Sequence, residues 1–283
     1  MRITLTAFAV AALCSSNALA QRRSDAGAAR HTDAAVQAAD PWASFDALLR
    51  DVVRSNGVDY TALRARIETL RAVTAWLATH GPTSTPDEFR SSNARLAYWL
   101  NAYNASVLMG VAEAPSSMRN VLTYVPDSGF FRARRHRIDG RDLTLDDIEN
   151  REVRAVFHDA RVHFALNCAA RSCPPLRAGA YRADRVSSQL DEQARRYFAG
   201  DRVSIDEAGR RVRLVQLFEW FRDDFAAAVP GHARSTVSGA LGFVHTFAEP
   251  VLRAQIEAAC GPDGSRCTLA FEPYDWTLND ARR

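Results

Sequence analysis

The segment Arg95-Leu-Ala-Tyr-Trp-Leu-Asn-Ala-Tyr-Asn-Ala-Ser-Val-Leu-Met109 is the stretch that decides the predicted fold. After Arg95 it contains no charged residue, and apolar side chains fall on nearly every side of a helix drawn through it. A helix that is apolar all round is a buried helix. We therefore predict a central buried helix over about residues 98–109, against which the other elements pack.

Two amides interrupt this apolar helix. Asn101 and Asn104 are three positions apart and so lie on one face. A buried amide without a partner costs about 1–3 kcal/mol. One interpretation is that both amides bond to the backbone of a nearby loop, because buried polar groups are nearly always paired. The other is that they orient a site residue or a substrate carbonyl.

The patterns around the central segment predict an α+β fold. Apolar residues at helical spacing predict helices over residues 45–53, 60–77, 186–197, 217–225 and 235–259. Asp139-Gly140 is a hairpin turn signal with both central residues at positive φ, and a second hairpin is expected around residues 207–209. Thr144 and Asp147 have capping-box spacing and open a helix that runs to Arg154. We predict one helix-rich domain, residues 41–283, with small antiparallel β-hairpins around a buried central helix.

The N-terminus has the pattern of a secretory signal peptide. Arg2 precedes an apolar run over residues 3–13, and Ala18-Leu-Ala20 is the small-x-small sequence of a cleavage site. This predicts a signal peptide over residues 1–20, a flexible lead-in over 21–40, and an exported protein, periplasmic or extracellular. No later run is apolar enough to span a membrane.

The charge pattern argues against a nucleic-acid partner. The net charge is +3, and the 36 basic residues are all arginine and are spread along the chain. We expect a small-molecule or protein partner instead, with no nucleic acid and no membrane span.

Four cysteines follow the predicted signal peptide. An oxidising compartment would allow Cys168, Cys173, Cys260 and Cys267 to form disulfides, and four cysteines can pair in three ways. Short loops favour local pairing, Cys168 with Cys173 and Cys260 with Cys267. Turn-forming residues between the second pair would bring its ends together.

The stretch Arg161-Val-His-Phe-Ala-Leu-Asn-Cys-Ala-Ala-Arg-Ser-Cys-Pro-Pro-Leu176 is where we place the candidate site. Cys173 precedes two prolines, which suit a helix start, and the free N–H groups of such a start favour a thiolate. His163 would be its base, and Glu149 would orient the imidazole. If residues 162–168 form a strand, His163 and Asn167 share a face and Cys168 points to the other.

Other interpretations of this stretch remain open. Cys168 and Cys173 could close a structural disulfide, which would leave Cys173 without a nucleophilic thiolate, or could be a redox-active pair. Zinc binding by His163 and the two cysteines lacks the usual ligand spacing, so no metal is expected. No cofactor is predicted.

Five motifs in order resemble the family called domain of unknown function 547. They are Tyr98-Trp-Leu-Asn-Ala-Tyr-Asn104, Leu143-Thr-Leu-Asp-Asp-Ile-Glu149, Arg161-Val-His-Phe-Ala-Leu-Asn-Cys168 with Ser172-Cys-Pro-Pro-Leu176, Phe218-Glu-Trp-Phe-Arg-Asp-Asp-Phe225 and Tyr274-Asp-Trp-Thr-Leu-Asn279. The resemblance covers about residues 94–279.

This resemblance implies a family with no assigned activity, found in exported bacterial proteins and in plant proteins with an added coiled coil. Asn150 departs from the family pattern, which has a histidine after Ile148-Glu149. Cys260 and Cys267 lie outside the family motifs, which indicates a local crosslink.

Two functions follow as expectations. The first is a cysteine-dependent hydrolase or acyl-transferase-like enzyme, with Cys173, His163, Glu149 and Asn104 as catalytic residues. Its substrate would contact Asn101, Asn167 and Cys168. The second is a non-catalytic binding or scaffold module that contains a structural Cys168–Cys173 disulfide.

Overall fold

Helix α5 (Ser92–Glu113) runs through the centre of the fold in the computed structural model, which describes residues 40–229, 236–262 and 264–282. Every residue of α5 from Leu96 to Ala112 is buried, as its all-round apolar sequence predicts. The Ser91 hydroxyl caps its first turn by accepting a hydrogen bond of 3.0 Å from Ala94 N. The predicted central helix is confirmed and is longer at both ends.

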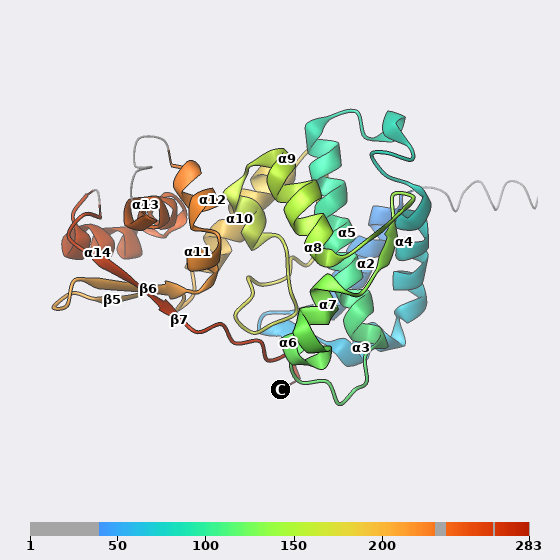
Figure 1. Cartoon of the computed structure of the whole chain (residues 1–283), viewed down its shortest axis with the longest axis horizontal. Helices are drawn as coiled ribbons and strands as arrows, with labels where there is room; N and C mark the ends of the chain where they lie inside the picture. Colours follow the sequence, from blue (N-terminus) through green and yellow to red (C-terminus); the bar gives the residue numbers. More distant parts are fainter. Residues whose placement is uncertain (1–39, 230–235, 263, 283) are drawn as a thin grey trace, which may run out of the picture. The chain divides into compact units, whose positions relative to one another are not determined.

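Short helices pack against α5. α2 (Pro41–Val52) comes first, followed by the two-stranded pair β1 (Val53–Arg54) and β2 (Gly57–Val58), then α3 (Tyr60–Ala65) and α4 (Ile67–Thr79) (Figure 1). The single helix predicted over residues 60–77 is wrong in one respect, because it breaks at Arg66, where φ is −114°. The apolar stripe continues through the break, which the periodic pattern could not reveal.

The predicted first hairpin is confirmed. β3 (His136–Ile138) and β4 (Arg141–Leu143) pair in antiparallel register, and Asp139 and Gly140 have φ values of 53° and 71°. Two short helices, α6 (Val121–Tyr124) and α7 (Gly129–Arg132), precede the hairpin. The Thr144 and Asp147 capping box is also present and opens α8 (Leu145–Asp147).

The helix after this capping box changes its winding. The segment Ile148–Arg154, labelled η3, is a π-helix, and α9 (Ala155–Phe157) ends it. π-Helical turns are rare in proteins, and those that occur are often at functional sites. Glu149 and Asn150 lie in this segment, next to α5.

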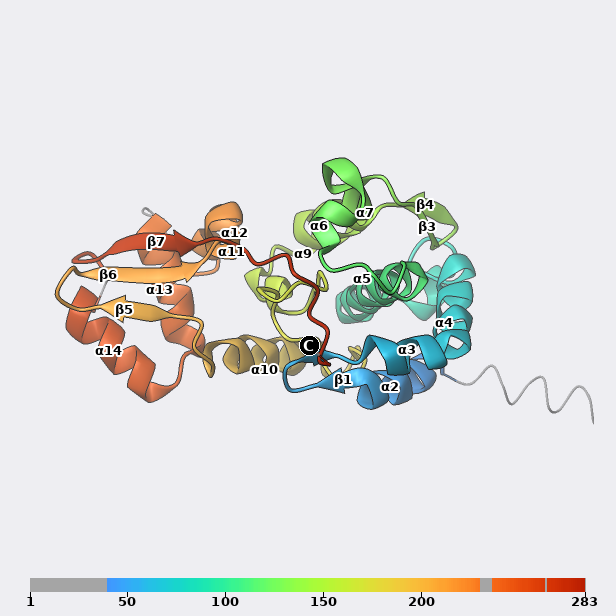
Figure 2. The same cartoon turned by 90° about the horizontal axis from the view of Figure 1, so that it is seen from below.

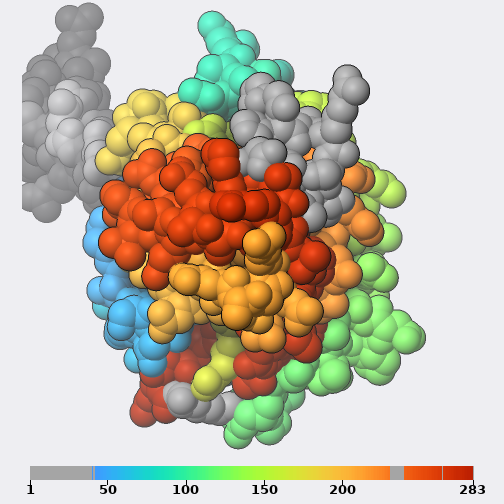
Figure 3. Space-filling model, turned by 90° about the vertical axis from the view of Figure 1, so that its left-hand side faces the viewer, coloured from blue at the N-terminus to red at the C-terminus, as the bar shows by residue number. Residues whose placement is uncertain are grey.

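A three-stranded sheet forms the second half of the domain. β5 (Ser204–Asp206) pairs antiparallel with β6 (Arg211–Val215), which confirms the predicted second hairpin, and β7 (Thr268–Glu272) adds parallel to β6. The parallel pair was not predicted. The connection to β7 contains α11 (Leu217–Trp220), α12 (Arg222–Ala227), α13 (Thr236–Phe247) and α14 (Pro250–Cys260) (Figure 1). Figure 3 shows this C-terminal part of the chain, coloured orange to red, on the face toward the viewer. Pro250 begins α14 and divides the single helix expected over residues 235–259.

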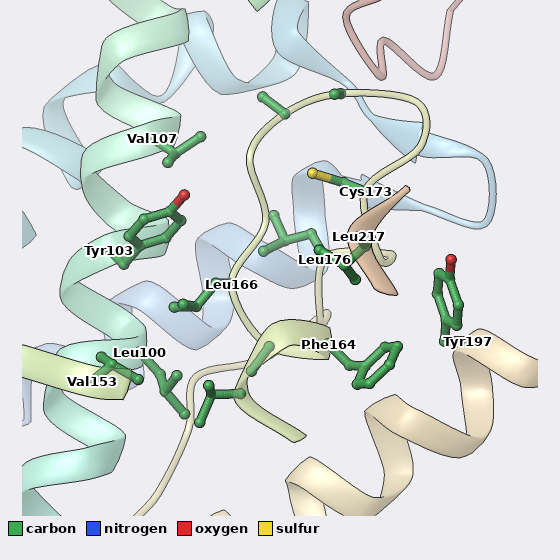
Figure 4. Packing of buried hydrophobic residues seen from close by; sticks show 14 of the residues in the cluster. Leu100, Tyr103, Val107, Val153, Phe164, Leu166, Cys173, Leu176, Tyr197 and Leu217 are labelled. Atoms are coloured by element: carbon green, nitrogen blue, oxygen red, sulfur yellow. The ribbon is translucent and has the colours of Figure 1, made fainter. Parts of the chain in front are cut away.

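The candidate-site stretch is mostly irregular. The strand predicted over residues 162–168 is wrong, because residues Ala160–Phe164 form a 3-10 helix, η4, whose first turn is capped by Asp159. The chain then runs without helix or strand to α10 (Val186–Phe198). Figure 4 shows Leu166 of this segment facing Tyr103 on α5, and Phe164 on the side toward Tyr197 of α10.

The tail after β7 docks onto the first half of the domain (Figure 2). Asn279 is buried, and its side-chain oxygen accepts a hydrogen bond of 2.6 Å from the Tyr60 hydroxyl. Its backbone carbonyl accepts a second hydrogen bond, of 2.9 Å, from Val58 N. Gly57 allows this approach, because a Cβ there would lie 2.1 Å from the Asn279 carbonyl oxygen. These contacts anchor the tail to the first half of the domain.

Both predicted cysteine pairs are disulfides. Cys168 is bonded to Cys173, and Cys260 is bonded to Cys267 across the turn that follows α14. The residues between each pair are too few to separate the two cysteines by much, which is why spacing alone indicated the pairing.

The predicted signal peptide and nearly all of the lead-in fall on residues 1–39, outside the described residues, so export stays a prediction. Throughout residues 40–229, 236–262 and 264–282, the helices are too short or too polar to cross a bilayer.

The hairpin turn is held by one buried carboxylate, and this gives a testable prediction. The Asp139 side chain has no exposed surface and accepts hydrogen bonds from Thr83 N (2.9 Å), Ser84 N (2.7 Å) and the Ser84 hydroxyl (2.8 Å). Asp139→Ala removes these acceptors, leaves the Thr83 and Ser84 N–H groups without this partner and puts alanine at positive φ. We expect the free energy of unfolding to fall by about 2–4 kcal/mol in a urea titration.

Asp142→Ala is the matched control on the next strand. Its side chain is 64% exposed and forms an ion pair with Arg137, which is also exposed. Such surface pairs contribute about 0–1 kcal/mol. Equal destabilisation by the two substitutions would contradict the assigned role of Asp139.

Candidate active site

A cavity of about 450 Å³ lies between α5, the π-helix η3, the irregular segment after η4, and the tail. Its volume is in the range of small-molecule sites. Three ionisable groups of interest border it, Tyr103 of α5, Glu149 of η3 and His163 of η4, together with Cys168 and Tyr274. Segments far apart in the chain therefore meet at one concave surface.

Glu149 is the most perturbed acid of the cavity. Burial raises its pKa to about 7, because water is largely replaced by protein around the charged form. The Arg154 charge and a hydrogen bond from the Tyr103 hydroxyl oppose this shift, whereas the negative charge of Asp146 adds to it. A carboxyl group that exchanges its proton near neutral pH is suited to general acid and base catalysis.

His163 is tied to a carboxylate other than the predicted one. Its Nε2 lies 2.8 Å from Oδ2 of Asp224, and the imidazole is stacked on Phe221 with 4.0 Å between ring centroids. A carboxylate only accepts, so Nε2 carries the hydrogen and Nδ1 has the lone pair. No hydrogen bond to Nδ1 occurs in the described part of the chain. Burial lowers the pKa of His163 despite the opposing effect of Asp224, so the ring is neutral at pH 7.

Asp224 is itself held by two hydrogen-bond donors, His163 and Arg154. Besides His163, it accepts hydrogen bonds from Arg154 Nε (2.7 Å) and Nη2 (3.2 Å). Burial alone would raise the pKa of Asp224, but the hydrogen bonds from His163 and Arg154 outweigh it and hold the pKa well below its ordinary value. Asp224 is therefore ionised under all ordinary conditions and fixes the tautomer of His163.

The predicted thiol constellation is not what the structure contains. The Cys173 sulfur is bonded to Cys168, so it is not a thiolate. His163 bonds to Asp224 and not to Cys173, and the interpretation of Glu149 as the group that orients His163 is wrong. The physical reason is that residues 160–164 are helical, which changes the direction of every side chain from that expected in a strand.

Among the three asparagines, two hold the irregular segment on α5. Asn101 makes paired hydrogen bonds with the backbone of Tyr181 (2.9 and 2.8 Å). Asn104 donates to the Ala165 carbonyl and accepts from Asn167 N, both at 2.9 Å. This is the loop-backbone interpretation of these amides, and it makes them positioning residues and not groups that touch a ligand in the cavity.

The third asparagine acts within the segment. Asn167 donates to the Pro174 carbonyl at 2.8 Å and accepts from Ala169 N at 3.0 Å. It thereby fixes the loop that contains Cys168 and Cys173. Asn150 stands where the family pattern has histidine, and it borders the cavity beside Glu149. Its side-chain oxygen accepts a hydrogen bond of 2.5 Å from Arg154.

An aromatic wall completes the cavity. Trp220, Tyr274 and Trp276 contact one another with ring centroids 4.6–5.8 Å apart, and Phe131 adds to Trp276 at 5.9 Å. Rings at these separations present both faces and edges to a ligand. The cavity is therefore lined by aromatic rings as well as by ionisable groups.

Three residues of this site were missed by the sequence analysis, namely Asp224, Tyr103 and Tyr274. Each lies inside one of the five quoted motifs, which is the signal that could have found them. The sequence predicted a helix over residues 217–225 but gave the Asp224 carboxylate within it no role. Within the described residues, no group of three or more His, Cys, Asp or Glu side chains is arranged to hold a metal ion.

Comparison with known proteins gives one match. Residues 86–198 match the model of the family described as protein of unknown function, DUF547, and this range contains Tyr103, Glu149, His163, Cys168 and Cys173. No curated protein and no solved structure matches the chain significantly. The match confirms the resemblance to the DUF547 family over residues 86–198.

Proposed function

We propose that the cavity is the active site of a hydrolase that activates water through His163 and protonates the leaving group through Glu149, without a thiol nucleophile. One observation carries the proposal. A carboxyl group with a pKa near 7 and a neutral histidine tied to an ionised aspartate border the same cavity. Pairs of groups whose pKa values are pushed apart are characteristic of acid and base assignments in enzymes.

His163 is the base of the reaction. Its Nδ1 takes a proton from water while the water oxygen bonds to the carbonyl carbon of the substrate. The positive charge that forms on the ring is stabilised by Asp224, which is already ionised and in place. Arg154 keeps Asp224 oriented through its own two hydrogen bonds and favours the ionised carboxylate, so the proton stays on the ring.

Glu149 is the acid. When the tetrahedral intermediate collapses, the bond between the carbonyl carbon and the leaving oxygen breaks, and the protonated carboxyl gives its proton to that oxygen. The carboxylate left behind accepts a hydrogen bond from Tyr103. Transfer of the proton from His163 to Glu149 through water restores both groups, so atoms and charges balance over the cycle.

The lining indicates the substrate class. Trp220, Tyr274 and Trp276 offer stacking surfaces, so a small ester or amide with a ring on one side of the scissile bond fits. A non-catalytic binding module is the competing proposal, and the same aromatic wall is the observation that favours it. The cysteine-dependent hydrolase or acyl transferase expected from sequence requires a free Cys173, which the disulfide withholds.

Two chromogenic esters separate the roles of the acid and the base. The phenoxide that leaves phenyl acetate is basic and needs a proton. The 4-nitrophenolate that leaves 4-nitrophenyl acetate is a weak base and leaves unprotonated. We expect Glu149→Gln to lower kcat/KM for phenyl acetate about 100-fold or more at pH 6 and to change 4-nitrophenyl acetate hydrolysis little. His163→Gln should lower both rates by a similar factor, because each reaction needs activated water.

His245→Gln is the matched control. His245 also pairs with a carboxylate, Glu257, at 2.6 Å, but it is exposed and lies on α13. Its substitution should leave both rates unchanged. Hydrolysis no faster than in buffer, or equal rates for wild type and both cavity variants, overturns the proposal in favour of a binding module.

The pH profile gives a second prediction. Glu149 must be protonated, and burial raises its pKa to about 7, so kcat/KM for phenyl acetate should fall as pH rises through about 7. His163 must be neutral, and burial lowers its pKa, so the fall on the acid side should lie below the ordinary histidine range. In Glu149→Gln the fall above pH 7 should disappear; a profile unchanged by this substitution would assign the fall to another group.

Insensitivity to alkylation is a third prediction. Since the proposed mechanism uses no thiol, the unreduced protein should keep its full phenyl acetate activity after iodoacetamide treatment. Inactivation together with a label on Cys173 would restore the thiol mechanism. The measurement is residual activity alongside peptide mass spectrometry.

A further inference from the structure

We propose that the Cys168–Cys173 disulfide is a redox centre that exchanges with a low-molecular-weight thiol entering the cavity, with Cys168 as the attacked sulfur and Cys173 as the leaving sulfur. This exchange does not rest on the hydrolase proposal, because it uses neither Glu149 nor His163. The argument rests on where the two sulfurs lie and on what surrounds them.

The two sulfurs differ in access. Cys168 is partly exposed and borders the 450 Å³ cavity, whereas Cys173 is 4% exposed and borders a different, smaller one. A thiol that enters the larger cavity therefore meets Cys168. The volume admits a small thiol, and the buried Cys173 is shielded from a folded protein partner.

The surroundings favour Cys173 as the leaving group. Its sulfur accepts a hydrogen bond of 2.9 Å from the Cys168 backbone N–H, and this contact distinguishes it from Cys168. The Tyr274 hydroxyl lies 3.2 Å from both sulfurs, so it can donate to Cys173 once the disulfide opens. Hydrogen bonds to the charged form favour a thiolate, and a more stable thiolate leaves faster. Burial raises the pKa of Tyr274, so its hydroxyl stays a donor. Arg54, Arg171 and Arg202 border the smaller cavity together with Cys173, against one carboxylate, Asp280, so its charged lining is net positive.

The exchange balances as follows. The thiolate of the incoming molecule attacks Cys168 Sγ and forms a mixed disulfide, while the Cys168–Cys173 bond breaks and its electron pair stays on Cys173. A second thiol of the same class attacks the mixed disulfide and releases Cys168. Two thiols are oxidised to one disulfide, two protons are released by them, and the two cysteines gain two electrons and take up protons.

The second disulfide of the chain is an internal control. Cys260 is fully buried and Cys267 is 6% exposed, and neither borders the 450 Å³ cavity. Both disulfides are present in the same molecule, so they experience the same thiol concentration and the same pH. Any difference in their rates of reduction therefore reflects their surroundings.

The test exposes the oxidised full chain to reduced glutathione, stops the reaction with acid and maps thiols and adducts by mass spectrometry. We expect Cys168–Cys173 to be reduced at least about tenfold faster than Cys260–Cys267, and the glutathione adduct to lie on Cys168. Tyr274→Phe should slow the first reduction about tenfold, which corresponds to one hydrogen bond to a charged group. Equal rates for the two disulfides, or an adduct on Cys173, overturn the proposal.

Matched variants keep the test decisive. Tyr181→Phe removes a buried hydroxyl that has no hydrogen-bond partner among the described residues, so it should not change the rate. Cys173→Ser leaves Cys168 as a thiol facing the cavity and should form a mixed disulfide with oxidised glutathione, whereas Cys168→Ser should not. Identical behaviour of these two variants would contradict the assigned direction. Phenyl acetate hydrolysis is tested with the Glu149 and His163 variants, whereas the exchange is tested with the cysteine and Tyr274 variants. Either proposal can therefore fail alone.

Discussion

The hydrogen bonds between two asparagines of α5 and the backbone of the segment after η4 are the interaction on which the rest depends. A helix buried on every side has no water to satisfy a polar side chain, and the irregular segment has no sheet partner to satisfy its backbone. Asn101 and Asn104 meet both needs at once, with one donor and one acceptor each. The segment is thus fixed without regular structure, and Cys168 near its start borders the cavity together with His163 of the preceding η4.

Electrostatics link this segment to a distant part of the chain. Arg154, His163 and Asp224 come from η3, η4 and α12, and the carboxylate of Asp224 accepts from both partners. Because Asp224 is satisfied by two donors, it stays ionised, whereas Glu149 lies in surroundings that disfavour its charge. One site thereby holds two carboxyl groups with opposite tendencies, which is the condition for dividing acid and base work between them.

Local patterns made parts of this structure predictable. The burial of α5, the Asp139-Gly140 turn, the Thr144 capping box and both disulfides depend on residues close in sequence, so spacing indicated them. The parallel pairing of β7 with β6 joins segments more than 50 residues apart, and the bond between His163 and Asp224 spans 61 residues. The winding of η3 and η4 is decided by tertiary packing and by the Asp159 cap, which periodicity does not register.

The tail that follows β7 has a consequence for the boundaries of the functional unit. The family match ends at residue 198, yet Asp224 and Tyr274 lie beyond it. A fragment trimmed to the matched range would keep His163, Cys168 and Cys173. It would lose the Asp224 carboxylate that orients His163 and the Tyr274 hydroxyl that contacts the disulfide. The smallest autonomous form of this protein therefore extends through the docked C-terminal residues, because the site is assembled across the full length of the domain and not within its most recognisable portion.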